Sequence, residues 1–303
     1  MINRKQYFMV GGVLLTSLIV ILYILFSISK PEQVDKAPQK EYRRIISMAP
    51  NITEILFALG LQNKLVGVTD FCTYPPDAKK IAKVGGYLNP NYEALLTLKP
   101  DLVILLPEQA NVKQYIEELH ISLLEVDNKK VEDIIQSISA IGYTCGARQK
   151  ADSIVADLQQ RIELVEKRVK GLPHSRVMIS IGRTVGSGNL GEVYAAGKNT
   201  YYEELLNYAG AVNAVENQLV AYPALSAEGI IRINPDIIID FVLDNVRNGL
   251  SDEQIKADWQ SVQRVSAFKN NRYYIFNRGY AVIPGPRFIL LLEDLANIIQ
   301  THN

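Results

Sequence analysis

Three glycines in the second half of the chain have the spacing of a phosphate-binding loop. Gly186, Gly188 and Gly191 fit the pattern G-x-G-x-x-G and follow a short apolar run, RVMISIG. In dinucleotide-binding proteins such a loop opens a helix, whose amino-terminal amides bind the pyrophosphate. Val193 extends the pattern to the form that protein kinases use, G-x-G-x-x-G-x-V. The chemistry that this spacing would support is therefore nucleotide binding.

The residues after the loop argue against a nucleotide site. The stretch EVYAAGKN is short and β-like, and we expect no helix to begin before about Tyr201. The H-R-D and D-F-G motifs of protein kinases do not occur in the sequence. We therefore predict a glycine-rich hairpin in place of a nucleotide-binding loop.

The sequence also lacks the motifs of common enzymes and the residue clusters of metal and nucleic-acid sites. It contains no G-x-S-x-G and no H-E-x-x-H motif, so an enzyme is not predicted. The histidines, His120, His174 and His302, form no converging set, which excludes a bare metal ion as the ligand. Lys plus Arg (32) equals Asp plus Glu (32), so the charge balance gives no argument for a basic nucleic-acid-binding surface.

The two cysteines, Cys72 and Cys145, could pair in an oxidising compartment or stay free.

A second spacing relates the two halves of the chain. One set of residues recurs in the same register: Tyr87, Glu93 and Pro100-Asp101, then Tyr222, Glu228 and Pro235-Asp236. In each copy an aromatic loop leads into a helix with Glu near its positive end, and Pro-Asp precedes a buried strand. We infer two similar lobes that enclose a cleft, where small molecules usually bind. Tyr87 and Tyr222 would face each other across it or merely pack their loops, and Gly188 would leave room at its mouth.

The elements that would position these residues alternate along the chain. Short β-branched runs predict buried parallel strands near residues 44–50, 65–70, 102–106 and 122–126. A second series of strands and helices follows, with strands at 176–182, 192–197, 236–241 and 272–277 and a terminal helix from about Arg287. Residues 147–170 predict a long helix that joins the lobes. The predicted fold class is α/β, with two Rossmann-like lobes at 43–146 and 172–303 and a linking helix at 147–171.

The first thirty residues predict export from the cytoplasm. Arg4 and Lys5 precede an uncharged apolar run, and residues 8–28 would span about 31 Å as a helix, enough to cross a bilayer. Residues 1–29 are therefore a membrane anchor or a signal segment, and both alternatives remain open. No cysteine lies nearby, which excludes a lipoprotein anchor. The polar stretch 30–42 is predicted to be a tether.

The exported part resembles a known family. Residues 43–303 are similar to the substrate-binding proteins of ABC importers for metal chelates, in RRIISMAPNITEILFALG and CTYPPDAKK and later in GKNTYYEELLNYAG and PGPR. These proteins carry cobalamin, ferric siderophores or haem, and the cobalamin-binding members are the most similar. The resemblance implies a class III periplasmic binding protein, with two lobes joined by one rigid helix and little hinge motion.

The resemblance also implies partners and site residues. Tyr74 in CTYPP matches a family tyrosine, and Tyr87 and Tyr222 stand where cobalamin binders often carry Trp. Arg287 in PGPR would bind a ligand phosphate or carboxylate, or form a salt bridge at the helix start. Trp259 is expected to pack in the protein interior and not to contact the ligand.

Permease docking is a further implication of the resemblance. Glu93 and Glu228 would dock on arginines of the permease, or serve only as helix-dipole carboxylates. The partners would be the ABC permease with its ATPase subunits and a cobalt or iron chelate as ligand. The location would be the periplasm or the extracytoplasmic face of the cytoplasmic membrane. The alternatives are a ferric siderophore or haem binder of the same type, and a membrane-anchored ligand sensor.

Overall fold

The computed structural model describes residues 40–216 and 219–300. The predicted anchor or signal segment at 1–29, most of the tether, and His302 lie outside the described residues. Within the described ranges, the helices are too short or too polar to cross a membrane.

The first lobe contains a parallel four-stranded sheet in the order β2-β1-β3-β4. Its strands are β1 (Ile45–Ser47), β2 (Leu65–Val68), β3 (Leu102–Leu105) and β4 (Ser122–Glu125). The helices around it are α2 (Pro50–Ala58), α3 (Tyr92–Thr97), α4 (Ala110–Glu118) and α5 (Val131–Thr144). All four predicted strands are present, but the prediction that β4 is buried was wrong. Strand β4 lies at one edge of the sheet and is only partly covered, whereas β2 at the other edge is mostly buried.

The second lobe contains a mixed sheet in the order β10-β9-β5-β6-β8, with β7 beside β5. Its strands are β5 (Arg176–Arg183), β6 (Val193–Ala195), β7 (Val212–Asn213), β8 (Ala224–Leu225), β9 (Ile237–Phe241) and β10 (Tyr273–Phe276). Strand β6 is antiparallel to β5 and confirms the predicted hairpin. A short loop can join antiparallel strands, whereas parallel strands need a long crossover.

Helices of the second lobe follow the strands in sequence. They are α7 (Tyr201–Tyr208), α8 (Ala227–Ile233), α9 (Asp244–Arg247), α10 (Asp252–Ala257), α11 (Ser266–Lys269) and α12 (Phe288–Gln300). Helix α7 begins at the residue expected from the sequence, and α12 begins one residue after Arg287. The α/β fold class with two lobes is therefore confirmed.

The repeat between the lobes is visible in a shared hydrogen-bond pattern. The Asp101 carboxylate, just before β3, accepts from the amides of Arg43 and Arg44 at 2.8 and 2.9 Å. Asp236, just before β9, accepts from the Arg176 amide at 2.8 Å. The Pro-Asp pair thus fixes the start of a neighbouring parallel strand in each lobe. This role explains why the pair recurs in register with the helix before it.

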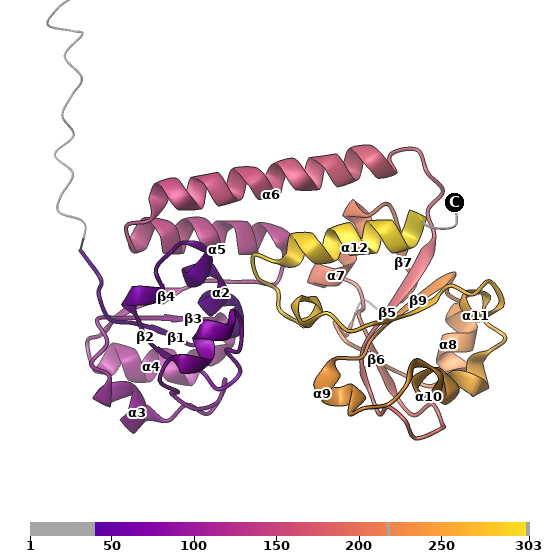
Figure 1. Ribbon diagram of the computed structural model, residues 1–303, viewed down its shortest axis with the longest axis horizontal. Helices are drawn as coiled ribbons and strands as arrows, with labels where there is room; N and C mark the ends of the chain where they lie inside the picture. Colours follow the sequence, from indigo (N-terminus) through magenta and orange to yellow (C-terminus); the bar gives the residue numbers. More distant parts are fainter. Residues whose placement is uncertain (1–39, 217–218, 301–303) are drawn as a thin grey trace, which may run out of the picture. The chain divides into compact units, whose positions relative to one another are not determined.

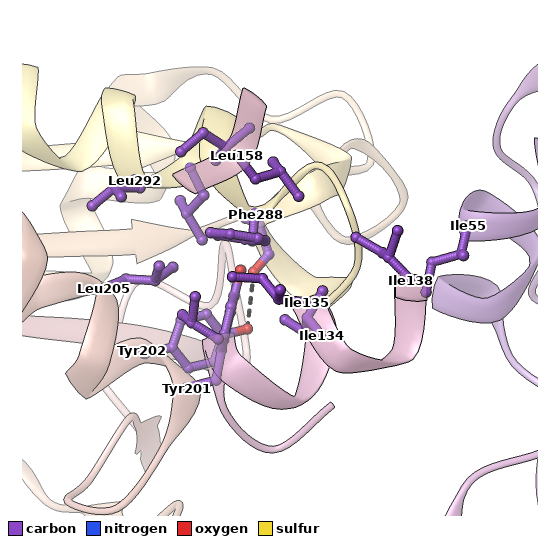
Figure 2. Packing of buried hydrophobic residues seen from close by; sticks show 14 of the residues in the cluster. Ile55, Ile134, Ile135, Ile138, Leu158, Tyr201, Tyr202, Leu205, Phe288 and Leu292 are labelled. Carbon is purple, nitrogen blue, oxygen red and sulfur yellow. Dashed lines mark hydrogen bonds between the residues drawn. The ribbon is translucent and has the colours of Figure 1, made fainter. Parts of the chain in front are cut away.

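The long helix α6 (Arg148–Val169) runs along helices of both lobes. It packs against α5 of the first lobe and α12 of the second (Figure 1). One hydrophobic cluster extends through these helices, α2 and α7, and its members include Ile55, Ile134, Leu158, Tyr201 and Phe288 (Figure 2). A large relative motion of the lobes would have to disrupt this shared core, which close packing disfavours.

Close packing of α5 on α6 depends on Gly142. A Cβ atom there would lie 2.4 Å from the Ala151 Cβ. We expect Gly142→Ala to lower the free energy of unfolding by about 1–3 kcal/mol, because the helices must move apart. Urea denaturation measures the change. Gly182→Ala is the matched control, since no heavy atom lies within 4 Å of its added Cβ. Equal stability of both variants would contradict this account of the helix contact.

Candidate ligand-binding cleft

A cavity between the two lobes, the first of two described below, is lined by both Tyr87 and Tyr222. Its volume is about 570 Å³. The first lobe contributes Tyr87, Glu108, Asn128 and Lys129, and the later part of the chain contributes Ile181, Asn199, Thr200, Tyr201, Tyr202, Ala221, Tyr222, Val282 and Pro284. The placement that the repeat predicted for the two tyrosines is therefore observed. Their contact with a ligand stays a prediction.

The Tyr87 loop is held in place by a residue that the sequence did not single out. The buried Gln109 side chain donates to the carbonyl oxygens of Tyr87 (2.6 Å) and Met48 (3.0 Å). Its Oε1 accepts from the Leu106 amide at 3.0 Å. One amide side chain thus connects the Tyr87 loop to the carboxyl ends of β1 and β3. Gln109 ends the short 3-10 helix Pro107–Gln109, and no signal in the sequence distinguishes a buried glutamine there from a solvated one.

The phenol groups of Tyr87 and Tyr222 have raised pKa values. Burial, with the nearby carboxylates of Glu108 and Asp127, raises the pKa of Tyr87 to about 12. Burial also raises the pKa of Tyr222. The Tyr222 ring lies edge-on to the Tyr202 ring, with centroids 6.4 Å apart. At neutral pH the cavity therefore offers aromatic surface and neutral hydroxyl groups.

A second cavity of about 600 Å³ contains Tyr74 and Arg287. Its other lining residues are Pro50, Glu54, Asp70, Phe71, Thr73, Leu243, Gly279, Val282 and Ile283. Val282 lines both cavities, so the segment around the short helix Gly279–Val282 lies between them. Tyr202 holds this segment by donating to the Ala281 carbonyl at 2.9 Å. The four predicted ligand-contacting side chains are therefore divided between two adjoining cavities.

Arg287 is bound by a carboxylate of the other lobe. Its Nε and Nη2 donate to Glu54 Oε2 and Oε1 at 2.8 and 2.5 Å. Its guanidinium carbon lies 3.6 Å from the centre of the Tyr74 ring. Burial raises the pKa of Glu54, and the hydrogen bonds and charge of Arg287 oppose this shift. The salt bridge considered from sequence is thus present, but its acid lies in α2 and not beside Arg287 in the chain.

The glycine loop belongs to neither cavity lining. The Gly186 and Gly188 amides donate to the Asp258 carboxylate at 2.7 and 2.8 Å. An internal carboxylate therefore occupies the amides that a phosphate would need, which agrees with the rejection of a nucleotide site. Gly188 is exposed, and the structure does not place it with Tyr87 or Tyr74.

Asp258 is part of a buried charge cluster that sequence reasoning missed. Arg183 binds Asp240 at 2.8 Å and Asp258 at 2.6 Å, and the three side chains are at most 2% exposed. Asp240 also accepts from Trp259 (3.2 Å) and Tyr273 (2.8 Å). Burial opposes ionisation of Asp258, but hydrogen bonds from Arg183 and the glycine amides outweigh it and lower its pKa. Trp259 is completely buried, in agreement with its predicted packing role.

Glu93 and Glu228 are exposed residues in the first turns of α3 and α8, away from both cavities. The Asn91 and Ser226 side chains cap these helices, accepting from the amides of Ala94 and Gly229. The Glu228 backbone amide and Ser226 lower the pKa of Glu228. The two positions are equivalent in the repeat and their carboxylates are open to a partner.

The cysteines and histidines form no reactive site in the described part of the chain. Cys72 and Cys145 are both buried and unpaired, which decides the alternative left open by the sequence. Burial raises the pKa of Cys145 to about 11. His174 contacts the Gly210 carbonyl at 2.9 Å. No group of three potential metal ligands occurs among residues 40–216 and 219–300.

Known proteins are similar to this chain in sequence and in architecture. Residues 45–278 match the family described as periplasmic binding protein. The chain is 31% identical over 273 residues to the uncharacterized ABC transporter substrate-binding lipoprotein YvrC of Bacillus subtilis (strain 168), covering 88% of this chain and 82% of that protein. It is 28% identical over 276 residues to the vitamin B12-binding protein of Vibrio vulnificus (strain YJ016), covering 90% and 93%. A solved structure of a possible iron-binding (periplasmic solute-binding) protein from Staphylococcus epidermidis ATCC 12228 has a TM-score of 0.70 at 27% identity, covering 86% of this chain and 100% of that chain.

Proposed function

The chain belongs to the periplasmic binding protein family, and on this premise we propose that it captures a bulky metal chelate and delivers it to an ABC permease. The chain is a non-enzymatic component of transport that works on the extracytoplasmic side of the membrane. The favoured ligand is a cobalamin or another corrinoid, because a vitamin B12-binding relative matches over 93% of its length. A ferric siderophore or haem is the alternative ligand. The family match favours transport over the membrane-anchored sensor.

One observation carries the proposal: each lobe contributes one tyrosine of the repeat, Tyr87 and Tyr222, to the same cavity. Aromatic walls suit a flat macrocycle, since they give large rigid contact area with few rotamers to restrict. We propose that Tyr87 and Tyr222 contact the ligand and that Tyr74 and Arg287 form the wall of the adjoining part of the site. Gly188 is not included, because it lies outside both cavity linings.

Calorimetric titration of the purified protein tests the function. Cyanocobalamin, hemin and a ferric hydroxamate siderophore are titrated separately. We expect one of them, with cyanocobalamin favoured, to bind with a dissociation constant on the order of nanomolar, which corresponds to about 12 kcal/mol. Lack of binding by all three chelates would overturn the proposed function.

Removing either cavity tyrosine tests the location of the site. We expect Tyr87→Ala and Tyr222→Ala each to weaken chelate binding by about tenfold or more, since buried aromatic contacts dominate such interfaces. Tyr194→Ala is the matched control, because Tyr194 is 48% exposed, much like Tyr222 at 43%, and lines neither cavity. Equal affinities for all three variants would place the ligand elsewhere.

The same proposal assigns Glu93 and Glu228 to permease docking. Their equivalent positions on two similar lobes suit a permease with two-fold symmetry, and charges at an interface rim mainly govern encounter rate and register.

A further inference from the structure

The charges in the two cavities are unevenly available to a ligand. Their charged lining residues are Glu108 and Lys129 in the first cavity and Glu54, Asp70 and Arg287 in the second. Carboxylates thus outnumber cations among the residues that line the cleft. An anionic ligand group gains most from a cation whose charge is not already neutralised by a protein carboxylate, so the ion pairs of Lys129 and Arg287 bear on what the cleft accepts.

Lys129 lies at the rim and is surrounded by carboxylates. Its Nζ is 3.2 Å from Asp127 Oδ2 and 3.5 Å from Glu108 Oε1, and its side chain is 57% exposed. Because more than half of this side chain is exposed, the lysine is largely solvated. Exposed ion pairs of this kind contribute little free energy. Two carboxylates face this one lysine, so the local charge is net negative. This part of the cleft therefore repels a buried anion.

Arg287 is the more deeply placed cation, and its Nε–Nη2 edge is occupied. Glu54 takes both Nε and Nη2, and the Tyr74 ring covers one face of the guanidinium. The Glu54 side chain is 2% exposed and that of Arg287 is 19% exposed. A ligand carboxylate that took this edge would leave Glu54 buried without its counter-ion, which is strongly unfavourable.

We propose that Glu54 acts as an internal anion that occupies Arg287 and thereby selects chelates whose buried periphery is neutral. This inference rests on the proposed function and narrows its ligand class. The amide-bearing periphery of a corrin ring meets the requirement, because amide groups can use the neutral tyrosine hydroxyls of the cleft. A chelate with free carboxylates, such as haem, does not meet it. Glu54 is therefore a specificity-determining residue.

The test is a change in ligand preference caused by Glu54→Gln. This variant removes the internal negative charge, and we expect the ratio of hemin affinity to cyanocobalamin affinity to rise by about tenfold as Arg287 becomes available to a hemin carboxylate. The double variant Glu54→Gln/Arg287→Gln should lose this gain. Affinities are measured by calorimetric titration, and the unfolding midpoint of each variant shows that it is folded.

Glu293→Gln is the matched control for loss of an ion pair. Glu293 also binds an arginine through two hydrogen bonds, from Arg161 at 2.8 and 2.7 Å, but it lies outside both cavities. We expect this variant to keep the wild-type preference. A gain of hemin affinity in Glu293→Gln equal to that in Glu54→Gln would overturn the inference, as would an unchanged preference in folded Glu54→Gln.

The wild type provides a second measurement that needs no variant. We expect it to bind cyanocobalamin more tightly than hemin. Tighter binding of hemin would overturn the inference and leave the proposed function standing. If the wild type bound neither of these nor the ferric hydroxamate, the proposed function would fail, and the inference with it.

Discussion

Replacing Arg183 by methionine is expected to lower the free energy of unfolding by about 3–5 kcal/mol, because two buried carboxylates lose their counter-ion. Arg183 binds Asp240 and Asp258, and both acids are completely buried. Asp258 also holds the glycine loop through the amides of Gly186 and Gly188. The variant should therefore release the loop as well as weaken the second lobe. Urea denaturation at neutral pH measures the loss.

The pH dependence of this loss distinguishes charge from packing. In the wild type the lowered pKa of Asp258 adds stability that is present above its unfolded-state pKa and is lost as the pH falls through the folded-state value. Without Arg183 the burial of Asp258 favours its protonated form, so acidification from neutral pH should reduce the difference between variant and wild type. A difference that stayed constant on acidification would indicate a packing defect.

Arg161→Met serves as the control for the Arg183 variant. Arg161 also binds a carboxylate, Glu293, but the two side chains are 30% and 35% exposed. Partly solvated pairs are weaker, and we expect a loss of about 1 kcal/mol or less. Losses of similar size in the two variants would refute the view that burial makes the Arg183 cluster important.

Changing Glu93 and Glu228 together to alanine is expected to reduce chelate uptake by cells to background and to leave chelate affinity unchanged. The two carboxylates are exposed and lie outside both cavities, so the cleft keeps its lining. Loss of both would remove the charges proposed to set the rate and register of docking. Uptake is measured with the labelled chelate that titration identifies, in cells that carry the importer and produce only the variant binding protein.

The control for docking is the double variant Glu132→Ala/Glu253→Ala. These glutamates also lie in first turns of helices, α5 in the first lobe and α10 in the second, and both are exposed. Glu253 resembles Glu228 closely, since Ser251 and its own backbone amide lower its pKa. We expect normal uptake by this control. Normal uptake by the Glu93/Glu228 variant at unchanged affinity would rule out docking through these two residues.

Much of the architecture could be predicted because it depends on local patterns. The apolar spacing of residues 147–170 predicted α6, and the β-branched runs predicted the first sheet and β5, β6, β9 and β10 of the second, but not the two-residue strands β7 and β8. The prediction failed for the burial of β4, because the hydrophobicity of a strand does not show which other elements will cover it; β2, at the opposite edge of the sheet, is mostly buried. The position of Tyr87 and Tyr222 in one cavity was also predicted, because a repeated pattern implies two lobes built alike.

The sequence by itself thus determined the two-lobed α/β fold, the long helix between the lobes and the tyrosines that meet in the cleft. Only the tertiary structure decided the partners of the buried charges. Arg287 binds Glu54, which lies 233 residues away in the chain, and Asp258 binds the amides of the glycine loop. Periodicity and helix signals act over a few residues, whereas an ion pair forms between whichever charged groups the folded chain brings within about 3 Å of each other.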